Sequence, residues 1–319
     1  MVTFAPRPGG VDEVLFAVAD GVGHVLLTRP RAINSLSHAM VGDLAATLIQ
    51  WRADPRIDEV VVRGAGERGL CAGGDIKAAR AAILAGEPGK AARFWADEYA
   101  LFGLIAAYPK PVEVVMAGVV MGGGLGLGMH AQRRPVSPDA RLAMPETGIG
   151  FFPDAGSTQV LARAPGELGT YLALTGAVVS AADAIAVGLA DDIDVREPTT
   201  APLLREREWI DACFAGDDPG AIAGRLERHT ANRARACGEL LRSRSPLSVA
   251  IALERIRRAA GETELDETLA VDAHVAAAMM HDSDFVEGVR ATVIDRDTPR
   301  WRHARIEDVP RDAVLGYFP

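Results

Sequence analysis

A run of glycines in the middle of the chain constrains the fold more than any other feature. Residues 121–128 read MGGGLGLG and follow a β-rich apolar stretch at residues 112–117. Glycine lets backbone turn tightly and approach a ligand or another segment, so the run predicts a loop that opens a helix. A second such loop, residues 71–75 (CAGGD), follows the apolar segment 59–63. Strand, glycine-rich loop and helix, used twice, predict a layered α/β core.

The rest of the chain divides into a mixed part and a helical part. Two β-rich runs, residues 14–18 and 22–27, are split by Asp20 and Gly21 and predict a hairpin. Helices are predicted, with Ser37 as the first N-cap, at residues 37–52, 76–84, 90–107, 169–175 and 180–188. The last strand signal lies at 193–195, and a helical pattern then continues through 284–295. We therefore predict a core of residues 1–197 and a helical C-terminal region of residues 198–319 that packs on it.

The composition is that of a globular protein and argues against several classes. The 319 residues are 49% hydrophobic and 24% charged, and the net charge of −9 disfavours a nucleic-acid partner while leaving room for a local basic patch. Cys71, Cys213 and Cys237 form no CxxC pair, and the seven histidines are scattered. We therefore expect reduced thiols, no metal site and a cytoplasmic location. No apolar run approaches the roughly 20 residues of a membrane span, so we expect no membrane partner.

The glycine loops suggest chemistry when they are taken together with two acids. One N–H group from each loop could converge on a single carbonyl oxygen, and Glu146 and Asp154 follow the second loop beside apolar residues. Such donors and a poised acid are what an enzyme needs when an oxyanion develops. Each loop alone is better explained as a tight turn, whereas the pair with both acids favours catalysis. The run at residues 121–128 does not read G-x-G-x-x-G, and no GxxxxGK[ST] occurs, so this run is not indicated as a nucleotide-binding loop.

Several motifs resemble those of the crotonase, or enoyl-CoA hydratase/isomerase, superfamily. They are residues 29–36 (RPRAINSL), 71–75 (CAGGD), 121–124 (MGGG) and 144–150 (MPETGIG). The resemblance tightens to the 3-hydroxyisobutyryl-CoA hydrolase branch, which serves valine catabolism. The motifs similar to that branch are residues 98–99 (EY), 152–154 (FPD), 172–176 (LALTG) and 284–290 (DFVEGVR). The resemblance spans residues 12–318. It implies a crotonase-like spiral of ββα units with a helical C-terminal extension.

The resemblance also implies roles for single residues. Gly74 and Gly123 match the oxyanion-hole N–H positions, and Glu146 matches the catalytic acid. Asp154 and Glu98 match polar groups of the hydrolase substrate pocket. Glu146 would either activate water or attack the carbonyl directly, and the sequence leaves both versions open.

Other residues of the same loops would contact the CoA part of the substrate. Arg29 and Arg31 would hold phosphates, with solvated loop charges as the alternative. Ala72 and Asp75 belong to the substrate-contacting loop, although Asp75 also suits the N-cap of the following helix. CoA arrives with the substrate, so we expect no separate cofactor.

The implied reaction is hydrolysis of a β-hydroxyacyl-CoA thioester, with 3-hydroxyisobutyryl-CoA as the expected substrate. Gly126 stands where hydratases carry a second glutamate, which disfavours hydration. The alternatives are an isomerase or hydratase-like enzyme that uses Glu146 alone, and a non-catalytic acyl-CoA-binding protein. His130 and Cys71 are expected to be structural rather than a general base and a nucleophile. A homo-oligomer would be in keeping with the superfamily.

Overall fold

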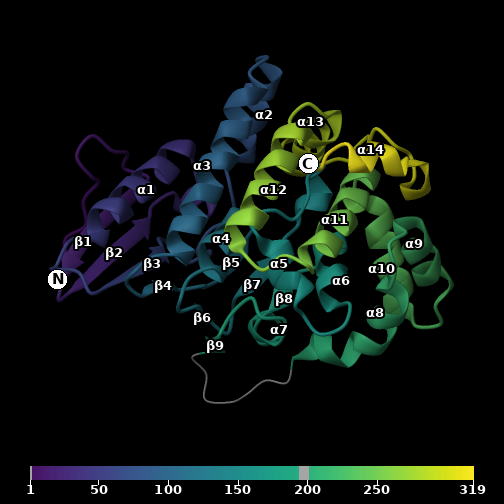
Figure 1. Cartoon of the computed structure of the whole chain (residues 1–319), viewed down its shortest axis with the longest axis horizontal. Helices are drawn as coiled ribbons and strands as arrows, with labels where there is room; N and C mark the ends of the chain where they lie inside the picture. The colour runs from purple at the N-terminus through teal and green to yellow at the C-terminus, as the bar shows by residue number, and fades with distance from the viewer. Residues whose placement is uncertain (1, 194–200) are drawn as a thin grey trace.

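The computed structural model describes residues 2–193 and 201–319. Within them, short sheets are surrounded by helices (Figure 1). The largest sheet has the order β1 (Val14–Ala19), β2 (Val22–Leu27), β3 (Glu59–Gly64) and β4 (Val112–Val114). Its first pair is antiparallel and its other pairs are parallel. A second sheet joins β5 (Val119–Met121), β7 (Arg141–Ala143) and β8 (Val179–Ser180), and β6 (Pro135–Val136) pairs with β9 (Asp192–Ile193).

The helices before the undescribed segment are α1 (His38–Arg52), α2 (Ile76–Leu84), α3 (Pro88–Ala106), α4 (Gly123–Met129), α5 (Ser157–Ala162), α6 (Leu168–Thr175) and α7 (Ala181–Ala186). Those after it are α8 (Arg207–Phe214), α9 (Pro219–Arg228), α10 (Asn232–Ser243), α11 (Pro246–Ala259), α12 (Leu265–Met279), α13 (Ser283–Val289) and α14 (Arg311–Leu315). Short 3₁₀ turns are η1 (Pro30–Ala32), η2 (Glu146–Ile149), η3 (Pro202–Glu206) and η5 (Ile306–Asp308), and η4 (Arg290–Asp295) is a π-helix. No described helix is both long and apolar enough to cross a membrane.

The local sequence explains the first elements. Asp20 and Gly21 have φ angles of 52° and 81°, the left-handed pair that a two-residue hairpin requires, and the predicted hairpin is confirmed. The hydroxyl of Ser37 accepts a hydrogen bond from the Met40 amide at 3.2 Å, so the predicted N-cap of α1 is confirmed as well.

Two predicted elements differ in extent from the structure. The strand expected at residues 112–117 ends at Val114, because Gly118 turns the chain with φ of 54° and the next strand, β5, joins another sheet. The late helix expected at 284–295 ends at Val289 and continues as the π-helix η4. Helical periodicity does not separate these two forms, whereas their hydrogen-bond spacing does.

The helical C-terminal region packs directly on the mixed part. One hydrophobic cluster runs through both, with α12 against α3 and α11 against α5 and α6 (Figure 1). Phe285 of α13 packs edge-on against Trp95 of α3, with ring centroids 5.5 Å apart. The predicted boundary between residues 197 and 198 lies outside the described residues.

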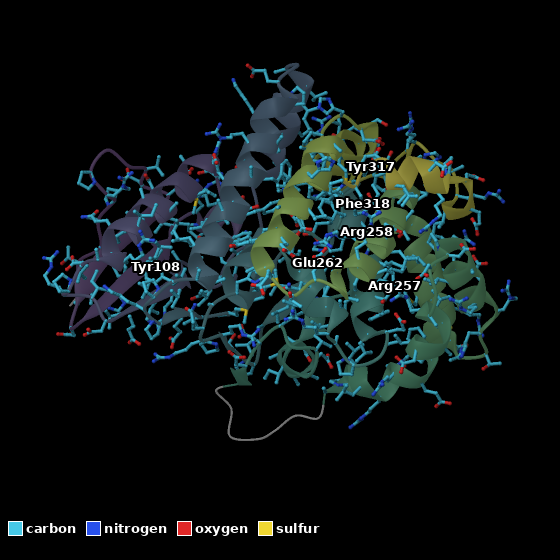
Figure 2. The ribbon with its side chains drawn as sticks, viewed as in Figure 1. Tyr108, Arg257, Arg258, Glu262, Tyr317 and Phe318 are labelled. Carbon is cyan, nitrogen blue, oxygen red and sulfur yellow. The ribbon has the colours of Figure 1, made fainter. Side chains whose placement is uncertain are left out.

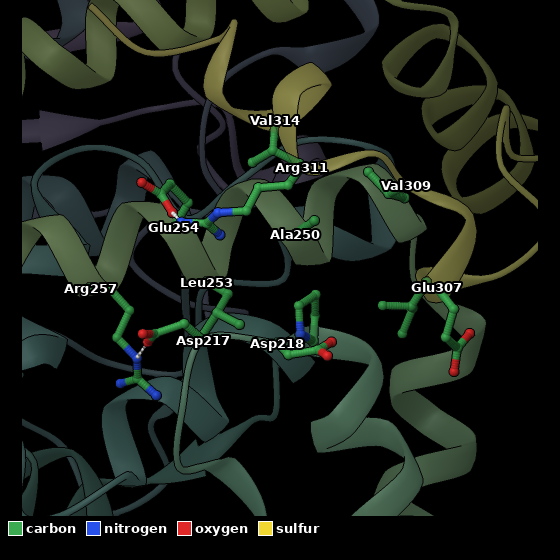
Figure 3. A pocket seen from close by; sticks show the side chains of 12 residues that line it. Asp217, Asp218, Ala250, Leu253, Glu254, Arg257, Glu307, Val309, Arg311 and Val314 are labelled. Carbon is green, nitrogen blue, oxygen red and sulfur yellow. Dashed lines mark hydrogen bonds and ion pairs between the residues drawn. The ribbon is translucent and has the colours of Figure 1, made fainter.

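The end of the chain is fastened to the C-terminal helices. Arg258 of α11 lies over the Phe318 ring at 4.4 Å, and the Tyr317 hydroxyl donates to Asp282 (Figure 2). Between α9, α11 and this segment lies a pocket of about 310 Å³ (Figure 3). Charges on its rim are paired within the protein, as in Arg257–Asp217 at 3.2 Å and Arg311–Glu254 at 3.1 Å. Asp218 and Glu307 also line the pocket, so carboxylates outnumber the two arginines there.

Two glycines give a matched test of the packing. A β-carbon at Gly169 of α6 would overlap the backbone carbonyl of Leu161, whereas one at Gly42 of α1 would meet nothing within 4 Å. We expect Gly169→Ala to lower the free energy of unfolding by about 1–3 kcal/mol through overpacking. Gly42→Ala should raise it by about 0.5–1 kcal/mol, since alanine loses less backbone entropy in a helix. Urea unfolding measures both, and equal shifts in the two variants would contradict the packing described for α6.

Candidate functional site

The two glycine-rich loops touch each other, as the sequence predicted. The Met121 amide donates to the Cys71 carbonyl at 3.0 Å, which pairs the ends of the segments that enter the loops. A β-carbon at Gly73 would lie 3.1 Å from the Met121 carbonyl oxygen and 3.4 Å from the Gly123 nitrogen. The two stretches of backbone are therefore in van der Waals contact, with no side chain between them.

Each loop offers one backbone N–H to the same cavity. Gly123 is the first residue of α4, where an N–H has no acceptor within the helix. Among the described residues, neither its N–H nor that of Gly74 donates to a backbone acceptor. Both glycines line a cavity of about 250 Å³. Two donors are therefore available to an oxygen of a ligand.

Three predicted acids line the same cavity although they come from separate segments. Glu98 lies on α3, Glu146 begins η2, and Asp154 lies in the loop before α5. Their exposed fractions are 1%, 6% and 4%. The other lining residues are Ala72, Gly73, Ile76, Trp95, Gly122, Pro145, Gly148, Ile149, Phe151, Arg244, Thr292 and Val293.

Glycine at two successive positions makes room for two of these acids. Gly122 has φ of 51°, and a β-carbon there would lie 2.8 Å from Glu146 Oε1. A β-carbon at Gly123 would collide with Glu98 Oε1. The peptide that carries the Gly123 N–H is thus flanked by both carboxyl groups, and no other residue type would allow this approach.

Burial raises the proton affinity of all three acids. The pKa values of Glu98 and Glu146 lie well above the ordinary carboxyl range, because burial disfavours their charged forms and Asp154 adds like-charge repulsion. Burial also raises the pKa of Asp154, to about 7. The Tyr99 hydroxyl donates to Asp154 Oδ2 at 2.5 Å and opposes that rise. Asp154 is therefore the acid that ionises most readily among the three.

Two carboxyl oxygens in the cavity have no protein partner among the described residues. They are Glu98 Oε1 and Glu146 Oε2. A buried polar atom without a hydrogen bond costs free energy, so such atoms mark places where a ligand or water completes the structure. Glu98 Oε1 lies against Gly123, and Glu146 lines the same cavity.

The predicted phosphate-binding arginines lie outside the cavity. Arg29 pairs with Asp75 at 2.8 Å and with Glu13 at 3.2 Å, so much of its charge is neutralised within the protein. Arg31 is exposed. Asp75 caps α2 by accepting from the Ala78 amide at 3.2 Å, as predicted. A role of Arg29 and Arg31 in phosphate binding stays a prediction.

His130 and Cys71 have the structural surroundings that were expected. His130 Nε2 donates to the Ala155 carbonyl at 2.7 Å, and burial lowers the pKa of the imidazole to about 4. Burial raises the pKa of the Cys71 thiol to about 12, which removes the thiolate a nucleophile would need. Within the described residues no three His, Cys, Asp or Glu side chains are grouped for a metal ion.

Sequence reasoning missed the cation of this cavity, Arg244. Its Nε donates to the Thr175 carbonyl at 2.8 Å, and its Nη1 lies 2.8 Å from the place of a β-carbon on Gly148. Burial lowers the pKa of Arg244, and no carboxylate of the described residues lies within 4.0 Å of its guanidinium. Arg244 lies 98 positions after Glu146, and only the fold brings it to the same wall.

Gly126 does not leave the site with a single acid. A β-carbon there would lie 2.6 Å from the Phe102 ring and 3.1 Å from Ala155, so the position is filled by packing. Glu98 and Asp154 provide further carboxyl groups in the cavity. The absence of an acid at Gly126 therefore does not by itself exclude hydration, and the expectation that hydration is disfavoured stays a prediction.

Comparison with known proteins agrees with this arrangement. The family model described as enoyl-CoA hydratase/isomerase matches residues 22–197 and 192–318. The 3-hydroxyisobutyryl-CoA hydrolase of Danio rerio is 33% identical, over 96% of this chain and 89% of its own length. That of Homo sapiens is 30% identical, over 96% and 88%.

Solved structures match the fold over nearly the whole chain. A carnitinyl-CoA dehydratase from Mycobacterium thermoresistibile is 42% identical, with a TM-score of 0.93 over 97% of both chains. An enoyl-CoA hydratase from Rhodobacter sphaeroides is 36% identical, with a TM-score of 0.91 over 96% of this chain and 97% of its own. The spiral fold expected from the motifs is confirmed, and the chain belongs to the enoyl-CoA hydratase/isomerase, or crotonase, family.

Proposed function

We propose that this protein hydrolyses the thioester of a small β-hydroxyacyl-CoA, with 3-hydroxyisobutyryl-CoA as its substrate. The observation that carries the proposal is the single cavity in which two backbone N–H donors adjoin three buried carboxyl groups. The relatives named 3-hydroxyisobutyryl-CoA hydrolase, aligned over 96% of this chain, support the choice of reaction and acyl group.

In the proposed reaction the thioester oxygen accepts hydrogen bonds from Gly74 and Gly123. These donors stabilise the negative charge that develops on the oxygen, an effect worth about 10²–10³-fold in rate for each donor in comparable sites. Glu146 either takes a proton from the attacking water or attacks the carbonyl carbon itself. The carbon–sulfur bond then breaks, and the thiolate of CoA leaves and takes up a proton. Where Glu146 is the nucleophile, water then hydrolyses the anhydride between the acyl group and Glu146, which releases the hydroxy acid and restores the carboxylate.

The remaining acids would recognise the acyl group. A β-hydroxyl donating to Asp154, or accepting from protonated Glu98, would meet the hydrogen-bonding needs of these buried groups. Arg244 also lines the cavity and keeps N–H groups beyond the Nε that Thr175 uses, so it can donate to a substrate oxygen. No step requires a cofactor other than the CoA of the substrate.

Addition or removal of water is the second candidate. The carnitinyl-CoA dehydratase at 42% identity favours it, and the cavity offers the two positioned carboxyl groups that such a reaction uses. In both reactions the two backbone N–H donors would bind the thioester oxygen. The two differ in whether the carbon–sulfur bond breaks.

An assay for free thiol separates the two candidates. We expect thiol release from 3-hydroxyisobutyryl-CoA and negligible loss of the double bond of crotonyl-CoA, because the proposed chemistry breaks the carbon–sulfur bond. A thiol reagent and the absorbance of the enoyl thioester report the two events in parallel. Rapid hydration or dehydration without thiol release would overturn the proposed function in favour of the second candidate.

Replacement of the central acid tests the mechanism. We expect Glu146→Gln to lower kcat by about 10²-fold or more, the loss typical of a missing general base, with a much smaller change in KM. The matched control is Glu239→Gln, because Glu239 is an exposed glutamate on α10 outside the cavity. Steady-state kinetics measure both variants, and activity within a few-fold of wild type would remove Glu146 from the mechanism.

Asp154 should set the preference for a hydroxylated acyl group. An unmet buried polar group costs about 1–3 kcal/mol, so kcat/KM should favour 3-hydroxyisobutyryl-CoA over isobutyryl-CoA by about tenfold or more. Asp154→Ala should erode that ratio more than it weakens the binding of free CoA. Equal kcat/KM for both substrates in the wild type would contradict the role given to Asp154.

A further inference from the structure

The turn that carries Asp154 holds an unfavourable backbone conformation. Ala155 and Gly156 both have left-handed φ angles, 59° and 72°. Glycine adopts this conformation freely, whereas it costs alanine about 1–2 kcal/mol. Such a turn persists only when its surroundings hold it. The position of the Asp154 carboxyl therefore depends on groups outside the turn.

Side chains from two helices hold successive peptide groups of this turn. His130, which ends α4, donates from Nε2 to the Ala155 carbonyl at 2.7 Å. The Gly156 amide donates to Asp272 Oδ2 at 2.8 Å, and this bond is buried. Asp272 lies on α12, 116 residues further along the chain. The C-terminal region thus reaches the turn that carries a proposed substrate contact.

Asp272 is itself held by a fully buried arginine. Arg255 of α11 donates from Nε to Asp272 Oδ1 at 2.7 Å, and both side chains are 0% exposed. The other end of the guanidinium donates to both carboxylate oxygens of Glu262, at 2.8 and 2.9 Å, and to the Thr268 carbonyl at 3.2 Å. Figure 2 shows Glu262 beside α11 and α12. A guanidinium held at both ends in this way restricts the Asp272 carboxylate to a single orientation.

Burial of these charges contributes little to stability by itself. Desolvation of a buried ion pair commonly cancels its attraction, and apolar residues of similar volume often serve as well. One oxygen of Asp272 is used by Arg255 and the other by the Gly156 amide. The arrangement therefore fixes the orientation of a backbone amide two residues from Asp154.

We propose that Arg255 and Asp272 are positioning residues, which hold the Gly156 amide so that the Asp154 carboxyl faces the acyl group of the substrate. This inference rests on the role given to Asp154 in the proposed function. Neither side chain lines the cavity, so both act through the turn. The C-terminal helices thereby contribute to catalysis beyond covering the core.

The charge of Asp272 gives the proposal an electrostatic consequence. Its carboxylate adds to the burial effect that raises the pKa of Asp154 to about 7, and it raises the pKa of Tyr99 as well. Burial raises the pKa of Asp272 itself, and the guanidinium of Arg255 opposes that rise. Removing the charge of Asp272 should therefore lower the pKa of Asp154.

Other titratable groups surround Asp154 on each side. Tyr99 and Glu98 face it from α3 and Glu146 from η2. His130, the C-cap residue that follows α4, stays neutral because burial lowers its pKa to about 4. None of these side chains is replaced in a variant at Asp272, so a shift in the titration of Asp154 traces to the change at Asp272.

Asp272→Asn tests the proposal with little change of shape. An amide offers one acceptor oxygen where the carboxylate offers two, so either Arg255 or the Gly156 amide loses its acceptor. We expect kcat/KM for 3-hydroxyisobutyryl-CoA to fall about 10- to 100-fold, as for a misplaced group. The preference over isobutyryl-CoA should fall with it, while the affinity for free CoA changes little.

A second readout needs no turnover. Carbon-13 NMR can follow the titration of aspartate carboxyl groups, and the Asp154→Asn variant identifies the Asp154 signal. In Asp272→Asn, the titration midpoint of Asp154 should move below its wild-type value of about 7. Arg255→Lys keeps both charges but loses the fork, so it should erode the substrate preference with little acidic shift of that midpoint. If Asp272→Asn does not fold, the substrate preference of Arg255→Lys tests the proposal in its place.

The control is Asp282→Asn, which removes another buried carboxylate. Asp282 pairs with Arg302 at 3.2 Å and makes no hydrogen bond to the turn among the described residues. It should leave the substrate preference and the Asp154 midpoint unchanged. An unchanged preference and midpoint in folded Asp272→Asn would overturn the positioning role. Absence of thiol release in the wild type would instead overturn the proposed function, and the NMR titration would still decide the link between Asp272 and Asp154.

Discussion

The site depends on a place where two segments of backbone touch directly. The Cys71 carbonyl accepts from the Met121 amide, and Gly73 leaves no side chain that would separate the loops. Close contact of this kind orients the Gly74 and Gly123 amides without any flexible side chain. An oxyanion site made of peptide groups needs no reorganisation when charge develops, which is the main advantage of a preorganised site. Strands and helices on either side serve to bring these loops together and to exclude water from them.

Keeping three buried carboxyl groups around one cavity has a thermodynamic cost. An acid whose pKa is raised by folding, as for Glu98 and Glu146, keeps its proton in the folded chain at pH values where the unfolded chain has lost it. The free energy of unfolding therefore falls as the pH rises from the ordinary carboxyl range towards these raised values. Stability is traded for a cluster of buried acids with raised pKa values, a common exchange in active sites.

Short sequence patterns predicted the structural features that depend on neighbouring residues in the chain. The hairpin at Asp20 and Gly21, the cap at Ser37 and the two glycine loops each depend on a few adjacent residues. Glu146 and Asp154 could be found because they follow the second loop closely. Arg244 and Asp272 could not, since their partners lie far away in the sequence and an arginine or aspartate on a helix usually faces solvent. The limits of β4 and of the π-helix η4 were missed because they depend on hydrogen-bond partners rather than on composition.

The wall that contains Arg244, Thr292 and Val293 bears on how the protein becomes active during its synthesis. A ribosome delivers the glycine loops, Glu98, Glu146 and Asp154 first, and the nascent chain can pack them before the last helices emerge. In that interval the cavity lacks the side chains of Arg244, Thr292 and Val293. The cavity is thus complete only when the final part of the chain has docked on the mixed part.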